Sequence, residues 1–178
     1  MASEPHAQIG LLAVADAARY RDIRLEALKR NPEAFGSTFE WENDKPLPWF
    51  EQRIAQSDIF GAFVEGDLRG IAGYLKQEGS KRDHKAMLWG MYVRANARNS
   101  GLGRRLVETV VKHASERVEL LQLTVVSENQ IAYRLYANLG FVEYGREMKA
   151  LRLDGRYYDE ILMVKFLIPD RAICANRM

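Results

Sequence analysis

Apolar residues along the chain recur at helical spacing in some segments and in short continuous runs in others, so the pattern predicts helices and strands in turn. Residues 7–13 form a short strand-like run. A helix is predicted to follow, with Asp16 as its N-cap and Asn31-Pro32 at its end, because proline disfavours helical geometry in the residue before it. One face of this helix is apolar and consists of Tyr20, Ile23, Ala27 and Leu28.

The next segment, residues 32–57, is predicted to be a loop that contains one short helix around residues 49–54. Pro46 and Pro48 lie near the first turn of that helix, where proline is tolerated. The segment is rich in aromatic side chains, which belong either to the core or to the wall of a substrate pocket: Phe35, Phe39, Trp41, Trp49 and Phe50.

A sheet is predicted from residue 58 onward. Two strand-like runs, 58–65 and 68–77, are joined by Gly66-Asp67 as a short hairpin turn. The run 85–93 is apolar almost throughout, which is typical of a strand in the centre of a sheet. The remaining elements are a helix over 101–116, a buried strand over 119–126, a helix over 129–139 that ends at Gly140, and a hairpin of 141–151 with 157–167 across Asp154-Gly155.

Composition and charge exclude several classes of protein. The net charge is only +2 and the basic residues are spread along the chain, whereas nucleic-acid binders concentrate them in a patch, so no nucleic-acid partner is expected. Cys174 is the only cysteine and the three histidines are scattered, which argues against a disulfide framework and against a metal site. Neither a signal peptide nor a membrane-length apolar run is present, so we expect a cytoplasmic protein with no membrane partner.

One loop between a predicted strand and a predicted helix carries candidate chemistry. It reads Arg98-Asn99-Ser100-Gly101-Leu102-Gly103-Arg104-Arg105. The first N–H groups of a helix lack internal partners and the helix dipole is positive there, so such a loop forms an anion site, usually for phosphate. Two better-known phosphate loops do not match: Leu106 stands where a dinucleotide fingerprint needs glycine, and no Gly-Lys-Ser/Thr triplet occurs. A plain strand–turn–helix connection would also explain the glycines.

The segment Arg98-x-x-Gly101-x-Gly103 resembles the acetyl-CoA loop of the GNAT N-acetyltransferases. A second stretch of that family is similar to Asn129-x-x-Ala132-x-x-x-Tyr136-x-x-x-Gly140-Phe141. The resemblance covers roughly residues 58–167 and fits the N-terminal third more loosely. It implies an α/β fold of the α+β type, with a mixed, mostly antiparallel sheet of about seven strands, flanked by about four helices and splayed between its two central strands. It also implies one N-acetyltransferase domain over 1–178, with 14–57 on the acceptor side and 169–178 as a weakly patterned tail.

The resemblance implies a binding site for acetyl-CoA as cosubstrate. In the family the pantetheine arm fills the gap between the splayed strands and bonds to the main chain, while the loop before the next helix holds the pyrophosphate. The residues that correspond here are Met91, Tyr92, Val93, Arg98, Asn99, Ser100, Gly101, Leu102, Gly103, Arg104, Asn129, Ala132 and Tyr136.

The resemblance also implies catalytic roles. A backbone N–H near Val93 would stabilise the oxyanion, and the Tyr136 hydroxyl would protonate the departing thiolate, with Tyr133 as the alternative donor. Many family members carry a glutamate on the central strand that acts as a base through water, but 85–93 contains no acidic residue. The base therefore stays open among four carboxylates that are more readily explained as solvated surface groups: Glu40, Glu42, Asp159 and Glu160.

The acceptor is expected to be the amine of a small molecule or peptide. Candidate contacts come from the first helices and the last hairpin, and they are Phe39, Glu40 and Tyr158. Formation of a homodimer is left open by the sequence. The alternative from a different functional class is a non-catalytic acyl-CoA sensor that has kept the fold.

Overall fold

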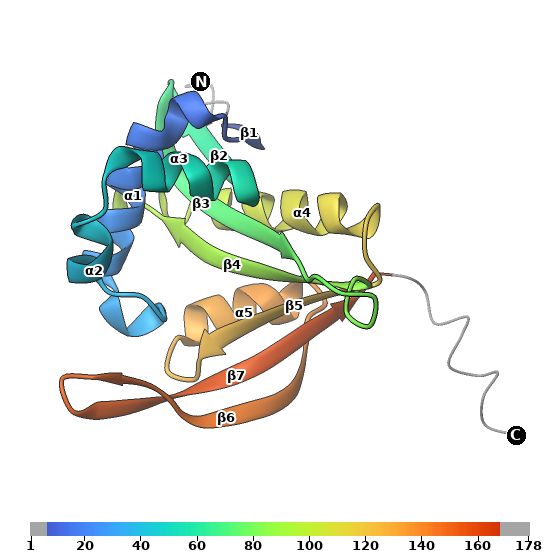
Figure 1. Ribbon diagram of the computed structural model, residues 1–178. Helices are drawn as coiled ribbons and strands as arrows, with labels where there is room; N and C mark the ends of the chain where they lie inside the picture. The colour runs from blue at the N-terminus through green and yellow to red at the C-terminus, as the bar shows by residue number, and fades with distance from the viewer. Residues whose placement is uncertain (1–6, 168–178) are drawn as a thin grey trace, which may run out of the picture.

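The computed structural model describes residues 7–167, which form a seven-stranded sheet with five α-helices (Figure 1). The strands are β1 (Gln8–Leu11), β2 (Asp58–Val64), β3 (Asp67–Lys76), β4 (Lys85–Val93), β5 (Leu120–Val126), β6 (Val142–Leu153) and β7 (Arg156–Phe166). The helices are α1 (Ala17–Arg30), α2 (Phe39–Asn43), α3 (Leu47–Gln56), α4 (Leu102–Ser115) and α5 (Gln130–Asn138). Three short 3-10 segments, among them η2 (Pro32–Ala34), connect these elements. Within this part of the chain, no helix is long and apolar enough to cross a membrane.

The strand order is β1-β2-β3-β4-β5-β7-β6, and every neighbouring pair is antiparallel except β4 and β5. The parallel pair is short: Lys85 to Met87 pair with Leu120 to Gln122. Beyond these residues the two strands diverge, as Figure 1 shows toward the left of the view. The expected splay between the two central strands is therefore confirmed, together with the mixed, mostly antiparallel sheet.

Helices cover both faces of the sheet and enclose two clusters of buried side chains. The amphipathic helix α4 packs its apolar stripe against the sheet in one cluster, which also holds Tyr136 and Phe141 around α5. The other cluster lies on the opposite face between the sheet and the helices α1 and α3, and its largest members include Tyr20, Ile23 and Phe50. The splay thus opens between a face covered by α4 and α5 and a face covered by α1 and α3.

A bulge in β4 changes which side chains face each cluster. Ile71 pairs with Tyr92 and Gly73 with Trp89, so two residues, Gly90 and Met91, lie opposite Ala72. Because side chains alternate along a strand, the extra residue moves Met91 and Val93 to the face of α4 and α5 and leaves Tyr92 on the other face. Gly90 has φ +62°, a left-handed conformation that favours glycine.

The structure corrects three details of the sequence interpretation. The β2–β3 turn is Glu65-Gly66 rather than Gly66-Asp67, since Val64 pairs with Asp67. Residues 39–43 form α2 inside a segment expected to be loop apart from a helix around 49–54, which gives five helices rather than about four. The short helix expected around residues 49–54 is present and spans Leu47–Gln56, with the prolines near its first turn as expected. Asp16 occupies the N-cap position of α1, but its carboxylate accepts a hydrogen bond from the Ala13 N–H rather than from the first turn of the helix. The tail predicted at 169–178 lies outside the described residues.

Candidate functional site

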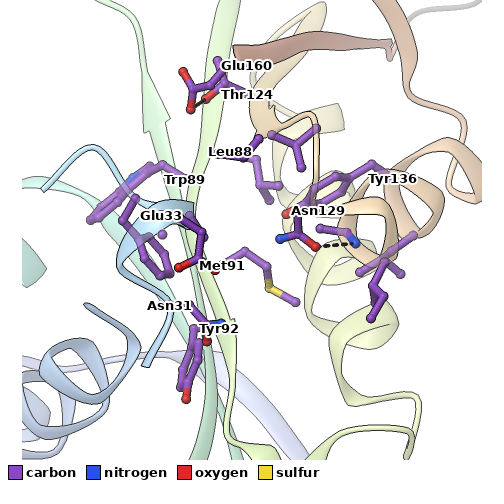
Figure 2. Close-up of a pocket in the computed structure, with 18 of the residues that line it drawn as sticks. Asn31, Glu33, Leu88, Trp89, Met91, Tyr92, Thr124, Asn129, Tyr136 and Glu160 are labelled. Atoms are coloured by element: carbon purple, nitrogen blue, oxygen red, sulfur yellow. Dashed lines mark hydrogen bonds between the residues drawn. The ribbon is translucent and has the colours of Figure 1, made fainter. Parts of the chain in front are cut away.

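A cavity of about 750 Å³ occupies the splay between β4 and β5. Its walls come from both faces of the sheet: from α5 on one face, and on the other from α1 and the segment 31–36 that follows it. Figure 2 shows Asn129 and Tyr136 on one side of this space and Trp89, Glu33 and Asn31 on the opposite side, with Met91 between them. The cavity therefore joins the two faces of the molecule at the only parallel step in the sheet formed by residues 7–167.

The wall from α5 contains the residues of the second motif. Asn129 precedes the helix, and its side-chain oxygen accepts a hydrogen bond from the Ala132 N–H at 3.2 Å (Figure 2), which leaves the amide nitrogen as a donor. Residues 129, 132 and 136 share one face of the helix, and all three line the cavity, whereas Tyr133 is not part of its wall. Burial raises the pKa of Tyr136 well above its usual range, so the hydroxyl keeps its proton at any working pH.

The strand wall consists of the end of β4, where Met91, Tyr92 and Val93 all line the cavity. The Tyr92 side chain points to the other face, where its hydroxyl donates to Glu26 Oε1 at 3.0 Å. The Tyr92 side chain is therefore not available to a ligand in the splay. The Val93 carbonyl accepts a hydrogen bond from Arg98 Nε at 3.0 Å.

The glycine loop lies next to this strand end. Gly101 is the N-cap of α4 with φ +75°, and the first helical bond runs from the Arg105 N–H to the Gly101 carbonyl at 3.1 Å. The N–H groups of residues 102–104 precede that bond and are open to an anion. A Cβ on Gly103 would approach Met91 Cε at 3.3 Å, so the loop lies close to the strand wall. Arg98 lines the cavity, while Arg104 forms an exposed ion pair with Glu108 at 2.8 Å.

The opposite face supplies a wall of aromatic and charged residues, which the sequence analysis did not predict as one group. The Trp89 indole lies over Gly73, where a Cβ would come within 2.4 Å of the ring. Glu33 and Phe35 contribute from the segment after α1, and Arg24 contributes from α1 itself. The aromatic residues of 32–57 were expected either in the core or in a pocket wall, and both occur: Phe50 belongs to the core, and Phe35 belongs to the cavity wall.

One of the candidate bases, Glu160 of β7, lines the cavity. Thr124 Oγ1 donates to its Oε1 at 3.1 Å, as Figure 2 shows. Burial raises the pKa of Glu160 above its usual range, and the negative charge of Glu147 adds to this effect, while the Thr124 hydrogen bond opposes it. A carboxylate with a raised pKa beside a cavity is suited to accept a proton.

Other sequence candidates lie elsewhere. Phe39, Glu40 and Tyr158 do not line the cavity. Glu42 is not a solvated surface carboxylate as expected, because it is fully buried in an ion pair with Arg24. Asp159 accepts a hydrogen bond from the Lys149 N–H at 2.8 Å, outside the cavity wall. Among residues 7–167, no group of three or more His, Cys, Asp or Glu side chains is arranged to hold a metal ion.

Comparison with known proteins shows both a family match and full-length relatives. Residues 22–141 match the sequence model of the acetyltransferase (GNAT) family. An L-amino acid N-acetyltransferase of Escherichia coli, AaaT, is 25% identical over 155 residues, which cover 85% of this chain and 94% of that protein. The L-methionine sulfoximine/L-methionine sulfone acetyltransferase of Pseudomonas aeruginosa is 24% identical over 149 residues, covering 79% of this chain and 87% of that protein.

Solved structures share the fold at lower identity. A GNAT-family acetyltransferase from Streptococcus pneumoniae superposes with a TM-score of 0.81 at 22% identity, covering 90% of this chain and 99% of that one. The yncA protein of Salmonella typhimurium, solved with its cofactor acetyl-CoA, has a TM-score of 0.78 at 20% identity, covering 94% of this chain and 97% of that one.

Proposed function

Since the chain belongs to the GNAT family of acetyltransferases and acetyl-CoA is its cosubstrate, we propose that it transfers the acetyl group directly to the amine of a small molecule or peptide. The observation that carries this proposal is the cavity that passes through the splay. Asn129 and Tyr136 line it from one face of the sheet, and Glu160 lines it from the other. Such a passage allows a thioester and an amine to approach each other from opposite faces.

The proposed binding of acetyl-CoA uses the elements next to the cavity. The N–H groups at the start of α4, with Arg98 beside them, bind the pyrophosphate in the loop 98–104. The main chain of Met91 to Val93 and the amide nitrogen of Asn129 bind the pantetheine arm, because the splay leaves the β5 side of β4 without a neighbouring strand. Ala132 provides a small surface on which that arm lies.

The proposed chemistry is a direct attack of the neutral amine nitrogen on the thioester carbonyl carbon. The backbone N–H at Val93 stabilises the oxyanion of the tetrahedral intermediate. Glu160 takes the proton that the nitrogen loses, directly or through water. The carbon–sulfur bond then breaks, and Tyr136 gives its proton to the thiolate sulfur. Exchange with solvent afterwards removes the proton from Glu160 and returns one to Tyr136.

The amine acceptor is proposed to enter from the face of α1 and the segment 31–36. Trp89 and Phe35 provide apolar contact there, and Glu33 and Glu160 provide negative charge that attracts an amine. The two relatives named for amino-acid substrates support small amino acids as the first acceptors to test. In an acyl-CoA sensor, the alternative function, no acceptor would react.

Replacing Tyr136 by phenylalanine tests the proposed chemistry. The variant removes one oxygen and keeps the ring, which contacts Phe141 edge to face at a centroid distance of 5.9 Å. We expect turnover to fall by a factor on the order of 100 to 10,000 while acetyl-CoA affinity is nearly unchanged. Such a loss equals roughly 3 to 5 kcal/mol of transition-state stabilisation.

Tyr133→Phe is the matched control, because Tyr133 lies on the same helix but outside the cavity wall. It should turn over like the wild type. Near-normal turnover of Tyr136→Phe would show that Tyr136 only packs, and a large loss at 133 would assign the proton to Tyr133.

A further inference from the structure

The buried arginine Arg24 of α1 is held along one edge only. Its Nε donates to Glu42 Oε2 at 3.0 Å and its Nη2 donates to Glu42 Oε1 at 2.7 Å, a two-pronged ion pair with α2. Arg24 is 4% exposed and Glu42 is fully buried. The positive charge of Arg24 outweighs the effect of burial, and the pKa of Glu42 lies below its usual range. The pair is therefore charged, and its position is fixed.

The other edge of the guanidinium, at Nη1, has no hydrogen-bond partner among residues 7–167. It faces the cavity, of which Arg24 is a wall residue, and the ring of Phe35 lies 5.1 Å from the guanidinium carbon. The N–H groups at this edge are thus free to donate to a ligand that brings oxygen atoms to it. Arginine presents paired N–H groups that match a carboxylate.

Gly90 lies beside this edge of the guanidinium. It lies in the bulge of β4, and even a Cβ at this position would come to 3.8 Å from Arg24 Nη1. Met91, the next residue, is part of the strand wall on the side of α5. An oxygen atom bound to Nη1 would thus lie beside the place where the amine and the thioester meet.

The charged residues of the cavity wall around Arg24 distinguish between two kinds of amine. Arg24 and Glu42 balance each other, whereas Glu33 has no hydrogen-bond or ion-pair partner within the described part of the chain, and Glu160 is bonded only to Thr124 there. A simple cationic amine would pair with these acids but would leave the Arg24 edge unsatisfied. A zwitterion pairs with both kinds of residue, because its ammonium group lies near an acidic side chain while its carboxylate binds Arg24.

We propose that Arg24 binds the carboxylate of the acceptor and that the acceptor class is small amino acids with a free amino group. This inference rests on the proposed acetyl transfer to an amine. Glu42 acts as a positioning residue that holds the guanidinium with its Nη1 edge toward the cavity. Trp89 and Phe35 then contact the apolar part of the amino-acid side chain.

The test compares each amino acid with the amine that lacks only its carboxyl group. The pairs are L-methionine with decarboxylated methionine and L-phenylalanine with phenethylamine, and kcat/KM is expressed per neutral amine. Wild-type protein should prefer the amino acid by roughly 10- to 100-fold, the range typical of charged hydrogen bonds. The preference should reside mainly in KM, since the carboxylate does not take part in the bond changes.

Three variants assign the preference to Arg24. Arg24→Met combined with Glu42→Leu replaces the buried pair by apolar side chains of similar volume, which proteins often tolerate. Arg24→Lys keeps a positive charge beside Glu42 and removes the Nη1 edge. Arg94→Met with Glu26→Leu makes the same two changes in a pair outside the cavity wall, whose Nη1–Oε2 distance is 2.6 Å. In the first two variants the ratio of kcat/KM for the amino acid to kcat/KM for its decarboxylated amine should fall to within about threefold of one. The third variant should keep the wild-type ratio.

The outcomes separate this inference from the proposed function. If wild-type protein acetylates amines without preferring the carboxylate, the acetyl transfer stands and the role of Arg24 is contradicted. A preference that persists in both Arg24 variants contradicts it as well. Failure to acetylate any amine contradicts the proposed function itself. Thermal melting of each variant verifies that it is folded.

Discussion

At the scale of single residues, Glu160 combines a partly buried carboxylate with a place in the cavity wall. If it accepts the proton of the amine, Glu160→Gln should lower kcat/KM near neutral pH by about 100-fold. The loss should shrink at higher pH, because a larger fraction of the amine is then already neutral. A pH profile of kcat/KM for both proteins measures this.

Glu147→Gln is the control for this substitution, since Glu147 pairs with Glu160 across β6 and β7 but does not line the cavity. It should retain activity close to that of the wild type, because the charge of Glu147 is the smallest of the influences on the pKa of Glu160. Equal, small effects at both positions would contradict a base at 160.

The raised pKa of Glu160 also has a consequence for stability. The native state binds the Glu160 proton more tightly than the unfolded state does. Protonated Glu160 therefore adds to the free energy of unfolding below the unfolded-state pKa, and this contribution is lost as the pH rises through the folded-state pKa. Glu160→Gln should therefore melt at a higher temperature than wild type at neutral pH, and the difference should vanish in acid. A variant that melts below wild type at neutral pH would show the opposite shift of the Glu160 pKa.

The residues of the site differ in how far the sequence could predict them. Tyr136 and Asn129 belong to a spaced motif, and both line the cavity. Arg24 was missed, although it follows Tyr20 and precedes Leu28 by one helical turn each and so lies on the buried face of α1. A charged residue on an apolar face was the available signal. Its partner Glu42 lies in a short helix that the pattern did not reveal.

At the scale of elements, the start of α4 is the proposed pyrophosphate site, and two serines allow a matched test. Ser100 and Ser115 lie near opposite ends of the helix, are both exposed, and donate to the carbonyl three residues earlier at 2.7 Å. Ser100→Glu adds negative charge beside the anion site and should weaken acetyl-CoA binding at least about tenfold by calorimetry. Ser115→Glu should bind like wild type. Equal affinity of the two variants would contradict a phosphate site at this end.

The elements themselves were largely predictable, and the errors have local causes. The turn at Glu65-Gly66 has positive φ at both positions, 53° and 83°, as a two-residue hairpin loop of this kind requires. Sequence favoured Gly66-Asp67 because Glu65 is not a typical residue there. Asp154-Gly155, with φ of 48° and 80°, is a common pair for this turn and was placed correctly.

At the scale of the whole molecule, the splay could be expected only from the family resemblance. It arises because β4 and β5 pair over three residues on each strand before diverging, and no local pattern encodes this divergence. That 14–57 forms the acceptor side of a single acetyltransferase domain stays a prediction. The cavity residues contributed by α1 and the segment 31–36 support it.

Binding of acetyl-CoA should stabilise the folded protein as a whole. At about 100 times its dissociation constant, a ligand specific for the native state adds about 2.7 kcal/mol, which for a domain of this length means several degrees in melting temperature. ATP and NAD at the same concentration should have much smaller effects. A shift with ATP that equals the one with acetyl-CoA would favour a nucleotide-binding module instead.

The most direct test of acetyl transfer is the release of free thiol from acetyl-CoA in the presence of a panel of amines. The panel includes L-amino acids, polyamines, aminoglycosides and peptides with free N-termini. We expect thiol release that depends on the amine, matched one to one by an N-acetylated product in the mass spectrum. Protein that is stabilised by acetyl-CoA but releases no thiol with any amine would contradict the account and identify an acyl-CoA sensor.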